Sequence, residues 1–346
     1  MPYMGWAASA KAALETSYGT SKAGSPAWVW LDLVSEGIEE DRQAILSAAL
    51  TGLQGARKAA PGVFMASGPL PMEFGPENCS QILYAAFGSV SSAEWGSYTP
   101  DMYDHTFTLG KLSPSFEMIM DLVQDADADT HTILRHLSGI TVQSFRFTGS
   151  METFVMFEPT IRAQKSGPYE GDIGTVSPAS QMPFVPIDGS ITIGGSAFTD
   201  SDNWEIATTR NPAEVPRWGS QFLRGVAPGA AVTTLTWDLY FDTVAELARF
   251  FGDYDNALTT RLEPQDVLET ANIVVTAKNT EASTNGDDYQ VQFKLPKVVW
   301  QKSGSYITGK DIIRQPMQGV ALYDSSATYD FAVVLRNTQT NATIIT

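Results

Sequence analysis

The sequence predicts a mainly β fold of two tandem domains, each a β-sandwich or barrel with one short flanking α-helix. Runs of alternating apolar and polar residues, which are typical of half-buried strands, recur along most of the chain. A similar helical segment occurs once in each half. The length of 346 residues and the 43% of hydrophobic residues suit two domains with sizeable cores.

The two helical segments are 78–88 and 242–252. Each begins at a residue that can cap free amide groups, Asn78 or Asp242, and each ends at a glycine suited to the left-handed conformation. In the second segment the apolar residues fall on one face, which leaves Arg249 to solvent. A chance likeness between two short apolar helices explains this motif alone equally well.

In the first half, residues 1–25 are rich in Ala, Ser, Gly and Thr and predict an N-terminal arm with at most partial order. Residues 26–165 are then the first β domain. Within it, residues 36–57 have helical propensity, but their glycines and charges favour a long exposed loop or hairpin equally, and both alternatives stay open. The expected strands are 28–34, 69–74, 105–109, 115–120 and 141–147.

The second half begins after a stretch without periodicity. Residues 166–189 are loaded with Gly, Pro, Ser and Asp, which predicts a linker or a long exposed loop. Residues 190–346 are then the second β domain. Its residues 233–241 alternate and lead into the second helix, and the Asn-Gly-Asp reversal at 285–287 predicts a long-looped hairpin. The other expected strands are 190–193, 272–277, 289–295, 298–300, 319–323 and 331–337.

The charge is strongly acidic, with 22 Lys plus Arg against 39 Asp plus Glu and a formal net charge of −17. This disfavours tight nucleic-acid binding, because affinity for a phosphate backbone comes mainly from cations. Acidity for solubility alone is the simpler explanation of the charge. No run of about 18 apolar residues predicts a membrane helix, and the start lacks the features of a secretory signal, so we expect synthesis in the cytoplasm. The lone Cys79 suits a reducing compartment and a buried position.

Candidate catalytic and metal-binding residues are few. The alternating carboxylates of residues 125–129 resemble the start of a calcium loop, but Thr130 and His136 stand where that loop needs Gly and Glu. A solvated acidic loop is therefore a better interpretation than a metal or acid–base site formed by His105, His131 or His136 with these carboxylates. His105 alternates within a strand and is expected to be a hydrogen-bonded structural residue. No motif of a hydrolase elbow, phosphate loop, dinucleotide fold or zinc protease occurs. The pair Gly194-Gly195 predicts a turn or bulge, and the tryptophans lie at strand alternation, which favours core or interface packing over sugar stacking.

The succession of several patches resembles the tail tube proteins, also called major tail proteins, of long-tailed bacteriophages of the non-contractile, siphovirus type. The patches are 15–20, 53–57, 104–108, 114–116, 139–145, 237–252 and 293–298. No single patch is specific, and their order and spacing carry the likeness across nearly the whole chain.

The resemblance implies a structural virion protein without enzymatic activity, cofactor or metal. It implies tandem tail-tube-type lobes, so that three copies close a pseudo-sixfold ring with a continuous inner β-barrel. Stacked rings would form the tube that passes genomic double-stranded DNA, with the tape measure, tail terminator and tail-tip proteins as partners and no membrane. The alternatives are another ring-forming component, such as a tail terminator or secretion-tube protein, and a β-rich carbohydrate-binding protein or hydrolase.

Carboxylates on the wall of such a tube would repel the duplex over about a Debye length and so ease its passage. The candidates for this position are Glu73, Glu117, Glu205 and Asp238. Which of them faces the lumen depends on strand register, because a slip of one residue exchanges the two faces of a strand.

Overall fold

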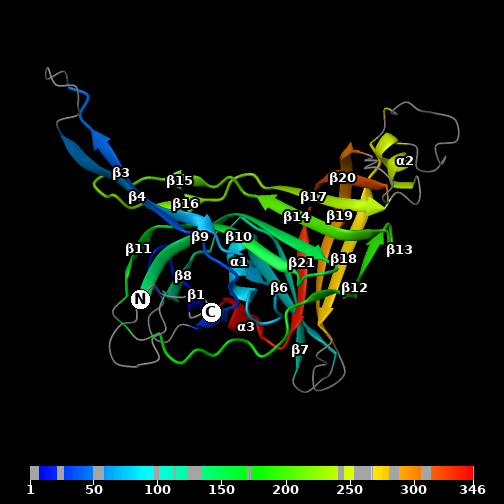
Figure 1. The fold of residues 1–346 in the computed structure, drawn as a ribbon, viewed down its shortest axis with the longest axis horizontal. Coiled ribbons are helices and arrows are strands. Elements are labelled where there is room, and N and C mark those ends of the chain that lie inside the picture. The colour runs from blue at the N-terminus through cyan, green and yellow to red at the C-terminus, as the bar shows by residue number, and fades with distance from the viewer. Residues whose placement is uncertain are drawn as a thin grey trace.

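The structure is a computed structural model that describes residues 8–21, 27–49, 58–96, 101–111, 114–122, 134–169, 171, 173–240, 245–252, 266, 268–279, 288–304 and 313–345. It is mainly β, with antiparallel strands and a few short helices, as predicted (Figure 1). The elements of the first half are β1 (Ser9–Leu14), β2 (Val29–Leu31), β3 (Glu39–Leu46), β4 (Ala59–Pro69), β5 (Met72–Glu73), α1 (Ser80–Phe87), β6 (Gly88–Trp95), β7 (Met102–Leu109), β8 (Phe116–Asp121), β9 (Leu134–Ser150), β10 (Met156–Ala163) and β11 (Lys165–Pro168). Those of the second half are β12 (Val185–Ile193), β13 (Ser196–Phe198), β14 (Ser201–Thr209), β15 (Ala213–Val215), β16 (Gly225–Ala227), β17 (Val232–Tyr240), α2 (Ala245–Phe251), β18 (Ala271–Asn279), β19 (Tyr289–Ser303), β20 (Arg314–Ala321), β21 (Ala332–Asn337) and α3 (Asn341–Ile345).

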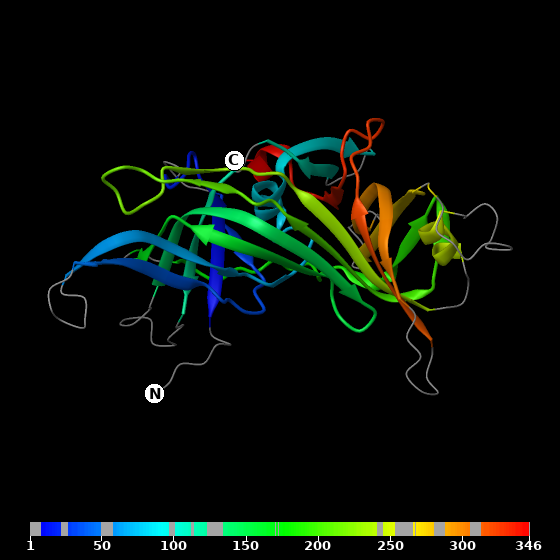
Figure 2. The ribbon, with the colours of Figure 1, turned by 90° about the horizontal axis from the view of Figure 1, so that it is seen from above.

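One broad antiparallel sheet contains strands from both halves, in the order β3, β4, β10, β9, β14, β17, β20, β19 (Figure 2). The halves meet where β14 pairs with β9, from Asn203 opposite Ser150 to Thr209 opposite Ser144. We refer to this run as the broad sheet. Its two ends are β3, from the first half, and the C-terminal part of β19, from the second.

A second set of strands packs behind the broad sheet, and its order recurs in the two halves. The N-terminal part of β9 leaves the broad sheet and pairs with β8 and β11, while β1 joins β8 to β2. The N-terminal part of β19 pairs in the same way with β18 and β21, while β12 joins β18 to β13. Both long strands have a register shift on this side, opposite Phe116–Met118 in β8 and opposite Ala271–Ile273 in β18.

The core is rich in aromatic side chains. Phe147 of β9 is fully buried, and its ring lies 4.8 Å from the rings of both Phe157 and Phe293 and 5.5 Å from that of Phe74, measured between centroids. Phe157 and Phe74 belong to the first half and Phe293 to the second. Burial of these large apolar surfaces therefore stabilises the two halves together.

The two predicted helices are present as α1 and α2. Gly88 ends α1 in the left-handed conformation with a φ of 83°. Asn78 does not cap α1, because its side chain accepts a hydrogen bond from the Gly75 amide instead. The prediction that Arg249 faces solvent is wrong, since its side chain is only 10% exposed and forms an ion pair with Glu246. The proposed capping residues 242–244 lie outside the described residues.

Several strands lie where the sequence predicted irregular structure. Within the predicted arm, β1 is a largely buried strand between β2 and β8. The segment 36–57, for which helix and loop or hairpin were both left open, contributes the first strand of the β3–β4 hairpin, so the hairpin alternative is confirmed; this hairpin projects from the body in Figure 1. Within the stretch 166–189, β11 and the start of β12 are strands, and Phe184 is fully buried against Phe74. The two expected strands 289–295 and 298–300 form one strand, β19, which passes through Pro296 beside the register shift.

Candidate assembly surfaces

Three of the four candidate carboxylates lie on the exposed face of the broad sheet. Glu205 of β14 is opposite Thr148 on one side and Thr236 on the other, and Asp238 is two residues beyond Thr236 on β17. Glu73 of β5 lies on the same face, because it pairs with Met156, which pairs in turn with Thr148. Side chains separated by an even number of residues on a strand share a face. The sheet therefore brings Glu73, Glu205 and Asp238 to one surface.

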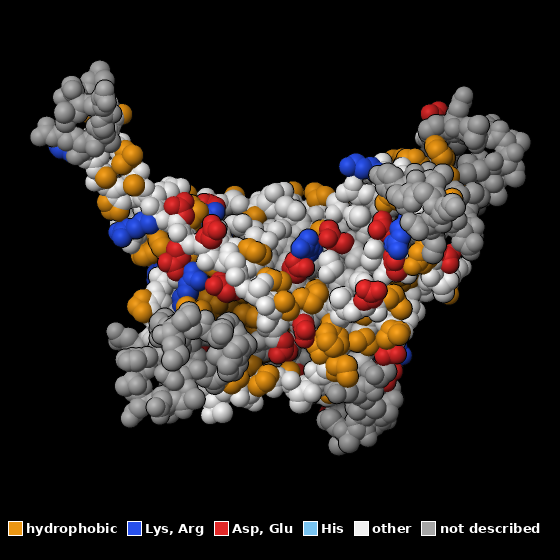
Figure 3. All heavy atoms as spheres, in the orientation of Figure 1, with side chains coloured by type: hydrophobic (Ala, Val, Ile, Leu, Met, Phe, Trp, Pro, Cys, Tyr) orange, Lys and Arg blue, Asp and Glu red, His pale blue; other side chains and the backbone are white. Residues whose placement is uncertain are grey.

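This surface carries basic groups as well. The Arg146 guanidinium lies 2.6 Å from the Glu158 carboxylate and 3.5 Å from that of Glu205, and the hydrogen bond to Glu158 raises the Arg146 pKa. Burial and the neighbouring Asp32 carboxylate raise the pKa of Glu73. Acidic and basic side chains are also interspersed on the face drawn in Figure 3. The surface has mixed charge, and its carboxylates are partly neutralised.

The fourth candidate, Glu117, is not on this face. Its side chain on β8 is 3% exposed and accepts hydrogen bonds from His136, at 3.0 Å, and from Ser21, at 2.6 Å. Burial acts to raise the Glu117 pKa, but these hydrogen bonds outweigh it and the pKa is lowered. The carboxylate ties β8 to β9 and to the chain near Ser21.

Each end of the broad sheet is an open strand edge in the described part of the chain. β3 pairs with β4 alone, and all its residues are exposed. Beyond Val298, β19 pairs with β20 alone, and Gln301 and Lys302 are exposed. Unpaired backbone groups on such edges are a template for pairing with another chain.

The junction of β9 and β14 shows how two such edges join within the chain. Arg210, directly after β14, is 2% exposed, and its amide donates to the Gln143 carbonyl at 3.0 Å. Its guanidinium donates to the Ala86 carbonyl at 2.6 Å and to the Gly110 carbonyl at 3.1 Å. Ala86 lies in the last turn of α1, where a cation is favourable to the helix dipole. A residue of the second half thereby holds the helix of the first half. The sequence reasoning missed Arg210, because an arginine after a strand carries no motif.

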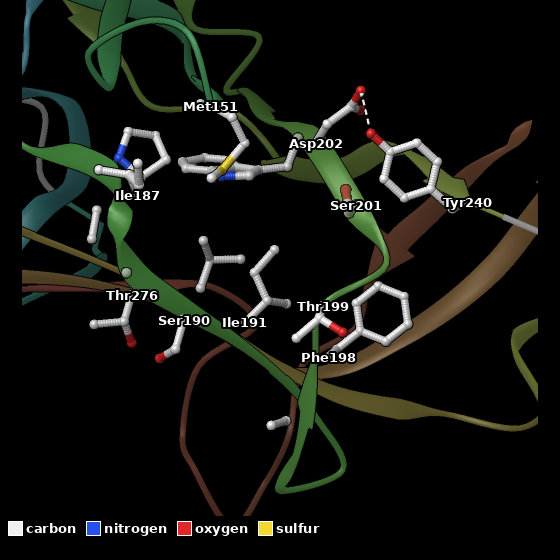
Figure 4. Close-up of a pocket in the computed structure, with 17 residues that line it drawn as sticks. Met151, Ile187, Ser190, Ile191, Phe198, Thr199, Ser201, Asp202, Tyr240 and Thr276 are labelled. Carbon is white, nitrogen blue, oxygen red and sulfur yellow. Dashed lines mark hydrogen bonds between the residues drawn. The ribbon is translucent and has the colours of Figure 1, made fainter. Parts of the chain in front are cut away.

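Two cavities occupy corresponding places in the two halves. One, of about 430 Å³, lies between β12, β14 and β18, with Ile187 and Ile191 on one wall and Phe198 on another (Figure 4). At its rim the Tyr240 hydroxyl donates to Asp202 at 3.0 Å. The other, of about 660 Å³, lies between β1, β2 and β8, and Val176 of the connection between the halves lines it. Both are largely apolar and lack a convergent set of catalytic groups.

The histidines of the described chain have structural partners. His105 is fully buried and contacts Ser92 at 2.6 Å and Asn337 at 2.9 Å, and burial lowers its pKa despite these hydrogen bonds. His136 is bound to Glu117 as described above. Residues 125–131, with the acidic run and His131, lie outside the described residues. Among the residues that the structure does describe, no group of His, Cys, Asp and Glu is placed to hold a metal ion.

Other sequence predictions concern packing. Trp204, Trp237 and Trp300 are buried in the core, as expected, whereas Trp218 at the turn between β15 and β16 is fully exposed. Gly194 and Gly195 form the predicted turn, between β12 and β13, with φ values of 61° and 84°. Cys79 is fully buried, which raises the pKa of its thiol.

Within the described ranges, no helix combines the length and apolar character needed to cross a membrane.

A family model described as phage tail tube protein matches residues 5–332. No curated protein matches the chain.

Proposed function

Because the chain belongs to the phage tail tube protein family, and is therefore a structural, non-enzymatic component of the virion tail, we propose that three copies close into a ring by joining their open sheet edges. Stacked rings form the tube, of the long-tailed non-contractile type, that passes genomic DNA. The observation that carries this proposal is the broad sheet, which repeats one strand order in both halves and leaves one open edge at each end.

The proposal treats the chain as two tandem lobes, 26–165 and 190–346, with 1–25 as an arm and 166–189 as a connection. Support comes from the matching strand orders β3, β4, β10, β9 and β14, β17, β20, β19. The corresponding positions of α1 and α2, of the register shifts in β9 and β19, and of the two cavities add to it. These shared features favour a tandem arrangement over a chance likeness.

Ring closure follows from the two open edges. In the chain, the edge strand of the second lobe pairs with the last strand of the first lobe. Repeating this junction between copies joins β3 to β19, and three copies supply six lobes. A closed barrel has no open edge, which removes the exposed amides that a single copy presents.

The exposed face of the broad sheet is the proposed wall of the bore. Glu73, Glu205 and Asp238 then face the DNA, while Glu117 does not. Because Arg146 lies beside two of the carboxylates on this face, we propose a weakly anionic wall that neither binds the duplex firmly nor repels it strongly. The tape measure, tail terminator and tail-tip proteins are the proposed partners at the two ends and inside the tube.

Electron microscopy of the purified protein tests this function. We expect concentration-dependent rings that stack into hollow filaments, with three copies and six similar lobes in the end view. Single particles at every concentration, or rings that never stack, would contradict a tube. A sixfold ring of six chains would contradict the tandem arrangement.

A further inference from the structure

The junction between β9 and β14 inside the chain predicts how one copy docks on the next. Each of these two strands has a counterpart at an open edge: β19 corresponds to β9, and β3 corresponds to β14. This inference rests on the proposed function and adds the register and the residues of the contact. It needs two alignments, of β19 with β9 and of β3 with β14.

The first alignment uses a bulge that both long strands share. Where β9 pairs with β10, Gln143 is a bulge residue: it has no opposite residue on β10, whereas its neighbours on both sides do. Where β19 pairs with β20, Gln301 is skipped in the same way. Bulges fix register, so Gln301 corresponds to Gln143 and Lys302 to Ser144.

The second alignment follows the hairpins that precede each helix. β4 lies between β10 and β3 as β17 lies between β20 and β14. Counting from the shared bulge, Arg162 of β10 corresponds to Val320 of β20. Arg162 pairs with Ser67 of β4, and Val320 pairs with Thr234 of β17. Ser67 in turn pairs with β3, and Thr234 pairs with β14. The matched residues of the edge strands are Glu39 with Ala207, Asp41 with Thr209, and Arg42 with Arg210.

We propose that β3 of one copy pairs with β19 of the next in the register that places Asp41 opposite Lys302, and that Arg42 takes the part played inside the chain by Arg210. Within the chain, Thr209 lies opposite Ser144, the counterpart of Lys302. Arg210 reaches the carbonyl of Ala86, two residues before the glycine that ends α1. The matching position in α2 is Phe250, two residues before Gly252, whose φ is 75°. The Arg42 guanidinium therefore binds the Phe250 carbonyl of the neighbouring copy.

The charges at these positions fit the register. Asp41 and Arg42 on β3 and Lys302 on β19 are exposed, and the described part of the chain gives none of their side chains an ion pair or hydrogen bond. Glu40, which points to the opposite face, is already bound to Arg135 and Ser166. Directly opposed side chains of opposite charge stabilise a strand pair. The register thus brings together Asp41 and Lys302, two side chains of opposite charge that have no partner on the exposed face of the described chain.

A disulfide between copies tests the register. The variant Asp41→Cys with Lys302→Cys cannot close within one chain, because the edges are separated by the width of the broad sheet, roughly 30 Å. In oxidised assemblies we expect a covalently linked trimer on a non-reducing gel. The matched control is Glu40→Cys with Lys302→Cys, whose side chains lie on opposite faces and should leave monomers. The native Cys79 is fully buried.

Tubes of the double variant without the linked trimer, or equal linkage in the control, would overturn the register and leave ring formation standing. Failure of the unmodified protein to form rings would instead overturn the proposed function. Should the cysteine variant not assemble, charge exchange decides: Asp41→Lys and Lys302→Asp should each impair assembly, and the two together should restore it. Absence of restoration would overturn the pairing.

The variant Arg42→Met tests the proposed contact between the Arg42 guanidinium and the Phe250 carbonyl of the neighbouring copy. We expect the protein concentration needed for assembly to rise about tenfold or more, since a hydrogen bond from a charged donor is lost at each contact. The unfolding midpoint of the free chain should not change, because Arg42 has no partner among its described residues. The matched control is Arg217→Met, an exposed arginine on the turn between β15 and β16. Assembly of Arg42→Met at the unmodified concentration would overturn this contact.

Discussion

Arg210→Met should destabilise the free chain more than any substitution of an exposed arginine. The change keeps most of the apolar stem but removes a buried guanidinium that binds the carbonyls of Ala86 and Gly110. Each hydrogen bond from a charged donor contributes about 1.5–3 kcal/mol. Burial lowers the Arg210 pKa because the charged form loses hydration, and relief of that desolvation cost offsets part of the loss. We expect a net loss of about 2–4 kcal/mol.

The measurement is urea unfolding of the unassembled protein, followed by fluorescence and circular dichroism. A shift of the midpoint at constant slope reports stability. Amide exchange at the end of α1 should accelerate in parallel, since the last turn loses its partner. The matched control is Arg146→Met: Arg146 is half exposed, and its ion pairs should contribute less than about 1 kcal/mol. If the two variants shift the midpoint equally, the junction does not depend on Arg210 and the reasoning is refuted.

Four further changes test the core, the edge and the wall. Phe147→Ala should cost about 3–5 kcal/mol, measured by the same unfolding assay, because it opens a cavity where both halves meet. Gly68→Ala should disrupt the β3–β4 hairpin, since its Cβ would collide with the Gly37 carbonyl, and assembly should fail while Gly225→Ala, with open space around it and no left-handed backbone, assembles. His105 has a pKa below its ordinary 6.5, so the folded chain keeps it neutral while the unfolded chain takes up a proton; stability should fall as the pH drops below about 6.5, and His105→Gln should fall less. Asp238→Lys should slow DNA ejection from assembled virions, and an unchanged rate would contradict its place on the wall.

The sequence predicted the local elements with strong signals. The helices α1 and α2 were predicted from apolar periodicity and a terminal glycine, and the Gly194-Gly195 turn from its composition. The strand class followed from alternation, as in β17. These features depend on residues that are near one another in the chain, so the sequence alone is sufficient to predict them.

The features that were missed depend on distant partners. β1 consists mainly of small residues and is a strand because β2 and β8 flank it. β3, where the sequence left helix and hairpin both open, is exposed along its whole length, so no apolar pattern decides between them and only its pairing with β4 defines it. Glu117 alternates like a surface residue, yet His136, Ser21 and the packing of β8 bury it. Tertiary context overrides local pattern in each case.

The acidic edge of β3 also decides which arrangements of two copies are disfavoured. Two β3 edges that meet about a twofold axis at Glu40 would set Glu39 opposite Asp41 of the partner, and like charges directly opposed repel. Such a twofold dimer would use both β3 edges and leave only β19 edges, which cannot close a ring of this kind. In the proposed ring, each head-to-tail contact instead leaves one β3 edge and one β19 edge for the next copies. In the proposed assembly, the carboxylates of β3 would thus disfavour this twofold pair relative to the head-to-tail contact.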